Sequence, residues 1–259
     1  MITQFALRLI CGMSLMWSAM PRREVTSGFF RIQMLVVMGL SVLAALTGKV
    51  EDASAWGISS RLAFAIPAAV MGVLAYCGSI IWTLGRRKSG AAVVFAIAAL
   101  STAMVVYLAL QIRPPGESAP AVQPALTAFA ELTSSLLLGG AVTGMLLGHW
   151  YLTAPTMSIA PLSRLNAFFG AASVARLITS AVALSVGWNQ ISGSTHLTWL
   201  LLRWCAGIAG PLVVSVMTWR ILKYRNTQSA TGVLFVGVIV VFIGEMTAVL
   251  LLGETGIPF

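Results

Sequence analysis

Charged residues are scarce in this chain. Only 9% of its 259 residues are charged, whereas an ordinary soluble domain has about 25%. This scarcity argues against a soluble globular enzyme. Disorder is excluded as well, because 58% of the residues are hydrophobic and the mean hydropathy is +0.93. The composition therefore predicts one helical membrane domain without a separate soluble catalytic domain.

Cysteines and sequence motifs for cofactors are also scarce. The three cysteines, Cys11, Cys77 and Cys205, fall in three separate apolar stretches, and no CxxC or CxxCH spacing occurs. This pattern excludes a cysteine-held metal cluster and a covalently attached c-type haem. No glycine-rich nucleotide motif, P-loop lysine or HExxH motif is present. The cysteines are therefore expected to be buried apolar side chains.

Long apolar stretches dominate what remains. Eight of them are long enough for helices that cross a hydrocarbon core of about 30 Å, and they span residues 4–20, 29–47, 62–84, 90–112, 124–151, 165–187, 197–221 and 231–253. Their residues do not alternate between apolar and polar, so a β-barrel is not predicted. The first stretch is short and contains Arg8, and Ser18-Ala19-Met20 resembles the end of a signal peptide. Because Pro21-Arg22-Arg23 follows it, an uncleaved first helix is the preferred interpretation.

The distribution of basic residues predicts the orientation in the membrane. Short cytoplasmic loops retain Arg and Lys. Ten basic residues gather on one predicted side: Arg22, Arg23, Arg31, Arg86, Arg87, Lys88, Arg164, Arg220, Lys223 and Arg225. The other side has three: Lys49, Arg61 and Arg113. Both termini are therefore expected outside, in the cytoplasmic membrane if the protein is bacterial. The net charge of +9 then reflects topology, and no nucleic-acid partner is expected.

Short sequence similarities suggest an internal repeat. Trp82 precedes a basic loop and an apolar stretch with Phe95, and Trp219 precedes a similar pair with Phe235. The interpretation is a duplication of a four-helix unit, with halves at residues 1–112 and 113–259 in the same orientation. The alternative is chance similarity between apolar segments.

Four charged residues lie deep in predicted helices of the second half, and this is costly in a membrane. They are Glu131, Arg176, Arg203 and Glu245. At 1.5 Å per residue, all four lie about 10–16 Å from the outer ends of their helices. We therefore expect them to converge in one layer. Either they form ion pairs that lock the bundle, or they bind a ligand, a quinone head group or a proton.

Two histidines and two helix-perturbing features complete the candidate residues. His149 precedes Trp150-Tyr151 near the inner end of its helix, which is typical of an interfacial aromatic belt but also suits a haem or quinone contact. His196 lies at the outer end of another helix, on the same face as Arg203. On opposite sides of the membrane, the two histidines cannot both bind one haem, so haem b is less favoured than quinone.

Two further features concern the shape and packing of the helices. Pro211 predicts a kink near Arg203. A stripe of Gly140, Gly144 and Gly148 predicts close helix packing.

Three functions remain open from the sequence. The first is a membrane subunit of a redox complex that binds quinone or quinol near the Arg/Glu cluster, with other protein subunits carrying the electron chemistry. The second is a small secondary transporter that uses the same buried charges. The third is a structural or assembly subunit without a ligand.

Overall fold

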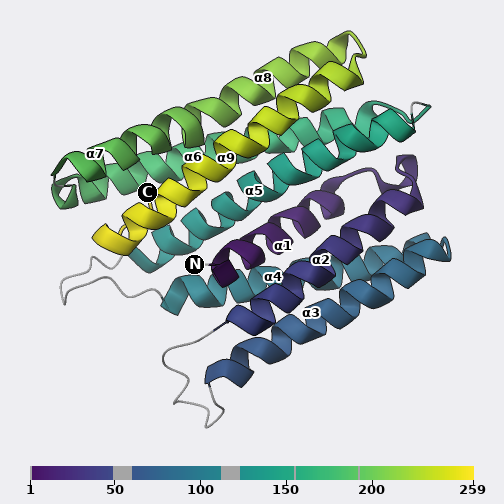
Figure 1. Ribbon diagram of the computed structural model, residues 1–259, viewed down its shortest axis with the longest axis horizontal. Helices are drawn as coiled ribbons and strands as arrows, with labels where there is room; N and C mark the ends of the chain where they lie inside the picture. Colours follow the sequence, from purple (N-terminus) through teal and green to yellow (C-terminus); the bar gives the residue numbers. More distant parts are fainter. Residues whose placement is uncertain (1, 49–59, 112–122, 155, 192) are drawn as a thin grey trace.

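The computed structural model describes residues 2–48, 60–111, 123–154, 156–191 and 193–259 (Figure 1). Within these residues the fold is all-helical and has no strand. The α-helices are α1 (Ile2–Ala19), α2 (Ser27–Thr47), α3 (Ser60–Thr83), α4 (Arg87–Gln111), α5 (Gln123–Thr153), α6 (Ala160–Gly187), α7 (Gly193–Leu202), α8 (Gly210–Lys223) and α9 (Thr227–Thr255). Short 3-10 turns form at Arg22–Glu24 (η1) and Trp188–Gln190 (η3), and a π-helical segment (η4, Arg203–Ala209) joins α7 to α8.

Seven segments in the described residues are long and apolar enough to cross a membrane. They are Ser27–Thr47, Phe64–Thr83, Arg87–Gln111, Pro124–Thr153, Ala160–Gln190, Gly193–Lys223 and Thr227–Thr255. Large apolar side chains such as Val73, Phe95 and Ile239 cover the outer surface of the bundle, where only lipid can shield them from water. The chain is therefore a multi-pass helical membrane protein.

The helix α1 is the remaining segment of the eight predicted crossings. It is 18 residues long, which corresponds to about 27 Å, and it packs between α2, α4 and α5. Every residue from Ala6 to Ser14 is buried, so α1 is largely enclosed by protein. A helix in this position needs fewer apolar side chains than one that faces lipid. Eight crossings stay a prediction.

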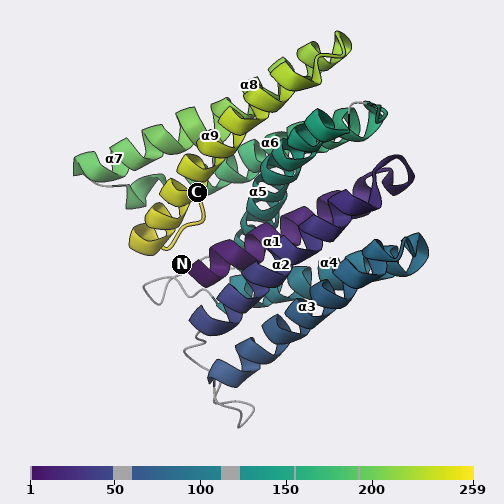
Figure 2. The same ribbon diagram turned by 45° about the vertical axis from the view of Figure 1, so that its right-hand side comes forward.

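The helices form two four-membered rings. In one, α1, α2, α3 and α4 contact one another in cyclic order, and in the other α5, α6, α8 and α9 do so. The rings meet mainly where α1 packs against α5, near the middle of the molecule (Figures 1 and 2). The proposed sequence counterparts differ in environment, because Trp82 is buried against Phe30 at 4.4 Å between ring centroids, whereas Trp219 is 50% exposed. The internal repeat and the two domains stay predictions.

The turns rich in arginine and lysine gather at one end of the bundle, which we call the basic end. The α1–α2, α3–α4, α5–α6 and α8–α9 connections all lie there, and both termini lie toward the opposite end (Figure 1). The guanidinium of Arg87 joins two of these turns, because its Nη1 donates to the backbone oxygens of Arg22 at 3.1 Å and Arg23 at 2.9 Å. The side of the membrane that each end faces stays a prediction.

Some helix limits and one burial expectation were wrong. The sixth apolar stretch is helical from Ala160 rather than from 165, so the connection after Thr153 is shorter than predicted. Cys11 is buried, but Cys77 and Cys205 lie on the exterior of the bundle. The physical reason is that lipid is as apolar as a protein core, so an apolar thiol on a membrane helix can face it.

Candidate functional site

Glu245 is the centre of a buried ionic cluster between three helical segments. From α6, Arg176 donates through Nε to Oε1 at 3.1 Å and through Nη2 to Oε2 at 3.2 Å. From η4, Arg203 donates through Nη1 to Oε1 at 2.9 Å. Ser134 of α5 donates to Oε2 at 2.5 Å. The predicted convergence is therefore found for three of the four charged residues, and we call Arg176, Arg203 and Glu245 the Glu245 cluster.

The Glu245 cluster carries more positive than negative charge and has spare hydrogen-bond donors. Its two arginines and one glutamate are all nearly inaccessible, with Arg203 0% exposed and Glu245 1% exposed. Arg176 Nη1 and Arg203 Nε are buried and have no acceptor among the described residues. An unpaired buried donor, above all a charged one, is costly. A further oxygen atom or anion beside Arg176 Nη1 and Arg203 Nε would satisfy these two donors.

A change in helix type places Arg203 in the cluster. The segment Arg203–Ala209 is π-helical and directly precedes Gly210 and Pro211. Proline cannot donate the usual backbone hydrogen bond, so the chain before it must find another pairing. Here Gly207 packs directly on Gly244 of α9, and a Cβ atom at Gly207 would lie 2.7 Å from the Gly244 Cα. This contact brings the η4 backbone close enough for Arg203 Nη1 to donate to Gly244 O at 3.3 Å as well.

The residues after α9 fold back over the cluster. Gly256 adopts a left-handed conformation, with φ 71°, and its N–H donates to Leu252 O at 2.9 Å. This glycine ends α9 in the usual way and reverses the chain. Phe259 is buried beside Gly187 of α6, and its backbone oxygen accepts from Arg176 Nη2 at 3.0 Å. A carbonyl oxygen from outside the helices therefore already occupies one donor of the cluster.

Glu131 does not join the Glu245 cluster, which corrects the expectation for the fourth charge. Its carboxylate forms a buried ion pair with Arg8 of α1 and accepts from Gln4 at 3.0 Å. The reason is the close packing of α1 on α5, where a Cβ atom at Gly12 would lie 2.9 Å from the Gly139 Cα. Glu131 faces α1, whereas Ser134, on an adjacent face of α5, binds Glu245.

The two histidines lie apart from the cluster and from each other. His149 is exposed near the end of α5 at the basic end. His196 lies in the first turns of α7, with its ring 5.9 Å from that of Trp199. No group of three His, Cys, Asp or Glu that could hold a metal occurs in the part of the chain that the structure describes. The positions of His149 and His196 therefore do not allow both of them to bind one haem.

The stripe of Gly140, Gly144 and Gly148 packs against neighbouring helices as expected. The closest helix contact of α5 is a different one, between Gly139 and Gly12 of α1. Gly140 faces Phe169 of α6, and Gly148 faces Thr231 of α9. Sequence reasoning missed the contact between Gly12 and Gly139, and it missed Ser134 and the Phe259 oxygen as partners of the cluster. The adjacent pair Gly139-Gly140 was the available signal for the first of these.

Comparisons with protein-family models, with curated proteins and with solved structures found no match for this chain.

Proposed function

We propose that the chain is a membrane subunit of a redox complex and that it binds the head group of a quinone or quinol at the Glu245 cluster. The observation that carries this proposal is the pair of buried guanidinium nitrogens, Arg176 Nη1 and Arg203 Nε, that have no acceptor among the described residues. A quinone head group offers two carbonyl oxygens and an otherwise apolar ring. Such a ligand suits a small polar site enclosed by apolar helices.

The cluster also contains a hydrogen-bond acceptor for a quinol hydroxyl. Glu245 Oε2 accepts from the Ser134 hydroxyl at 2.5 Å, and Ser134 lies on α5 beside Ser135, which donates to the Glu131 backbone oxygen. In this proposal the arginines orient the ligand oxygens, and the Glu245 carboxylate, held by Arg176 and Arg203, accepts a hydrogen bond from a quinol hydroxyl. On oxidation the quinol releases two protons to water and two electrons. The electrons pass to a partner subunit.

The experiment for this function is a pair of measurements on the purified full chain. A short-chain quinone is titrated into the detergent-solubilised protein while tryptophan fluorescence is recorded, because Trp204 follows Arg203 in η4 and packs, with Trp199, against the apolar cluster that contains Phe259. Saturable quenching is expected. Proteins that copurify with the tagged chain are then identified, and a subunit with an iron–sulfur or haem centre is expected. Unsaturable quenching together with purification of the chain alone would overturn the proposal.

The second candidate is a small secondary transporter, and the Arg8–Glu131 ion pair favours it. This pair bridges the two helical rings, and the Glu245 cluster lies in the second ring on the other side of α5. Two units that move against each other around buried charges are a known arrangement for alternating access. Uptake of a substrate by liposomes that contain this chain alone would select this candidate over the redox subunit.

A further inference from the structure

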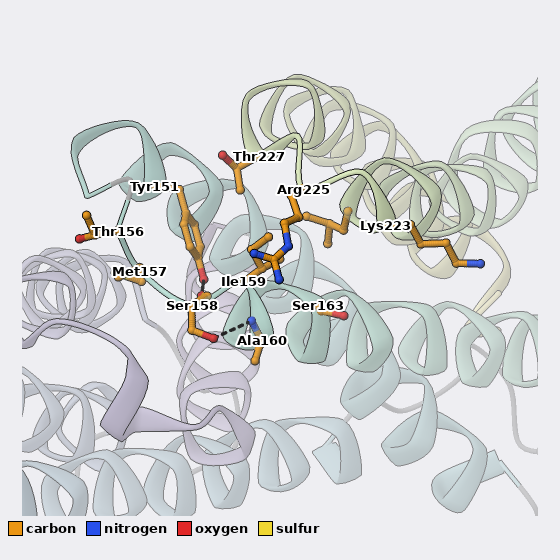
Figure 3. A pocket seen from close by; sticks show the side chains of 11 residues that line it. Tyr151, Thr156, Met157, Ser158, Ile159, Ala160, Ser163, Lys223, Arg225 and Thr227 are labelled. Atoms are coloured by element: carbon orange, nitrogen blue, oxygen red, sulfur yellow. Dashed lines mark hydrogen bonds between the residues drawn. The ribbon is translucent and has the colours of Figure 1, made fainter.

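A cavity opens at the basic end of the second ring, far from the Glu245 cluster along the helices. Its volume is about 740 Å³. The α5–α6 and α8–α9 connections form its walls, with Tyr151, Ser163, Arg225 and Thr227 among its lining residues (Figure 3). Because α5 ends at Thr153 and α9 begins at Thr227, the cavity lies at the ends of the membrane-spanning segments. This is the level of the lipid head groups.

Arg225 supplies the positive charge of this cavity. Its guanidinium points down between Tyr151 and the first residues of α6 (Figure 3). Arg225 has φ 55°, a left-handed conformation that is unfavourable for a residue other than glycine. No acidic side chain lines the cavity, and Arg225 forms no ion pair with any residue that the structure describes. The Arg225 N–H donates to Leu222 O at 3.0 Å, so the left-handed conformation ends α8. An arginine that lines a cavity without an acidic partner suits an external anion.

The groups around Arg225 determine which kind of anion the cavity can bind. Ala160 N at the start of α6 donates to Ser158 Oγ at 3.3 Å, and Tyr151 donates to the Ser158 backbone oxygen. The Tyr151 hydroxyl and the Ala160 N–H are therefore occupied, and Ser163 and Thr227 contribute further hydroxyl groups to the cavity lining. The positive end of the α6 dipole points in the same direction. Met157, Ile159 and Leu222 provide an apolar part of the lining.

Lys223 has a different role from Arg225. Its Nζ lies 3.6 Å from the centroid of the Trp219 ring, and its side chain points away from Arg225 (Figure 3). A lysine over an exposed tryptophan is typical of the membrane interface. Lys223 therefore places the mouth of the cavity at the bilayer surface.

We propose that this cavity binds the phosphate group of an anionic phospholipid, with Arg225 as its main contact. The phosphate lies between the guanidinium and the start of α6, and the apolar lining receives the glycerol and the first carbons of the acyl chains. A basic pocket between membrane helices is a recognised site for such head groups. This inference is independent of the function proposed for the Glu245 cluster.

The test measures lipid bound to the purified full-length protein by native mass spectrometry. The protein is solubilised in detergent and titrated with phosphatidylglycerol or phosphatidylcholine. The wild type is expected to prefer phosphatidylglycerol, and Arg225→Gln is expected to weaken phosphatidylglycerol binding about fivefold. Arg220→Gln is the matched control, because Arg220 is an exposed arginine near the end of α8 that does not line the cavity. It is expected to bind like the wild type.

Three results would overturn the proposal. One is equal weakening by the Arg225 and Arg220 variants, which would mean a general attraction to the basic end. Another is full competition by millimolar inorganic phosphate, which would assign the site to soluble phosphate. The third is unchanged binding in Arg225→Gln. Arg225→Lys keeps the charge and guards against misfolding, since it is expected to recover part of the affinity that Arg225→Gln loses.

Discussion

Arg8 of α1 and Glu131 of α5 form a buried ion pair across the interface between the two helical rings. This pair balances its own charge, whereas Glu245 is shared by two arginines. The Arg8–Glu131 pair is therefore a neutral contact that can only stabilise the bundle. The Glu245 cluster has two arginine nitrogens without an acceptor among the described residues. The two should respond differently to mutation.

The Arg8–Glu131 pair is expected to stabilise the contact between the rings without binding a ligand. Arg8→Met alone leaves a buried carboxylate without its cation and is expected to cost about 3–5 kcal/mol of stability. Arg8→Met with Glu131→Met removes both charges and is expected to recover most of that loss. Thermal unfolding of the detergent-solubilised protein, followed by circular dichroism, measures both. A double variant no more stable than the single one would contradict this assignment.

The contact between Gly207 and Gly244 is expected to be essential for the position of Arg203. A Cβ atom at Gly244 would lie 2.6 Å from Gly207 N, so Gly244→Val forces α9 away from η4. Overpacking of this kind costs about 1–3 kcal/mol, and quinone binding should weaken with it. Gly232→Val on the same helix is the control, because no atom lies within 4 Å of a Cβ there. Equal unfolding midpoints for the two variants would count against the close contact.

The basic end is expected to face the cytoplasm. Single cysteines replace Arg86 at the basic end and Glu254 at the opposite end, in a variant whose three natural cysteines are serine. Both positions are exposed. A thiol reagent that cannot cross membranes should label Glu254→Cys in intact cells and Arg86→Cys only in inside-out vesicles. The reverse pattern would overturn the predicted orientation.

The sequence was sufficient for the fold class, and it located the layer of buried charges but not their pairing. Counting residues from helix ends estimates depth, and the depths of Arg176, Arg203 and Glu245 agree with their contacts. Pairing also depends on the direction each side chain points around its helix and on which helices are neighbours. Residues three apart on a helix point about 60° apart, and this is enough for Glu131 to face α1 while Ser134 faces Glu245. Pro211 indicated a distortion, but the π-helical form depends on the contact of Gly207 with α9.

Quinone binding at the Glu245 cluster is tested most directly by the quinone affinity of Arg176→Gln together with its unfolding midpoint. This variant keeps the Arg203–Glu245 pair, so the remaining cluster is neutral and the fold should persist. Arg220→Gln serves as the control for the loss of one positive charge. If the cluster is a ligand site, Arg176→Gln should bind short-chain quinone about 10- to 100-fold more weakly, the worth of a hydrogen bond from a charged group, with helical content and unfolding midpoint close to those of the wild type. A variant that unfolds at a lower temperature but retains wild-type affinity would show that Arg176 only stabilises the bundle and that the Glu245 cluster is not the quinone site.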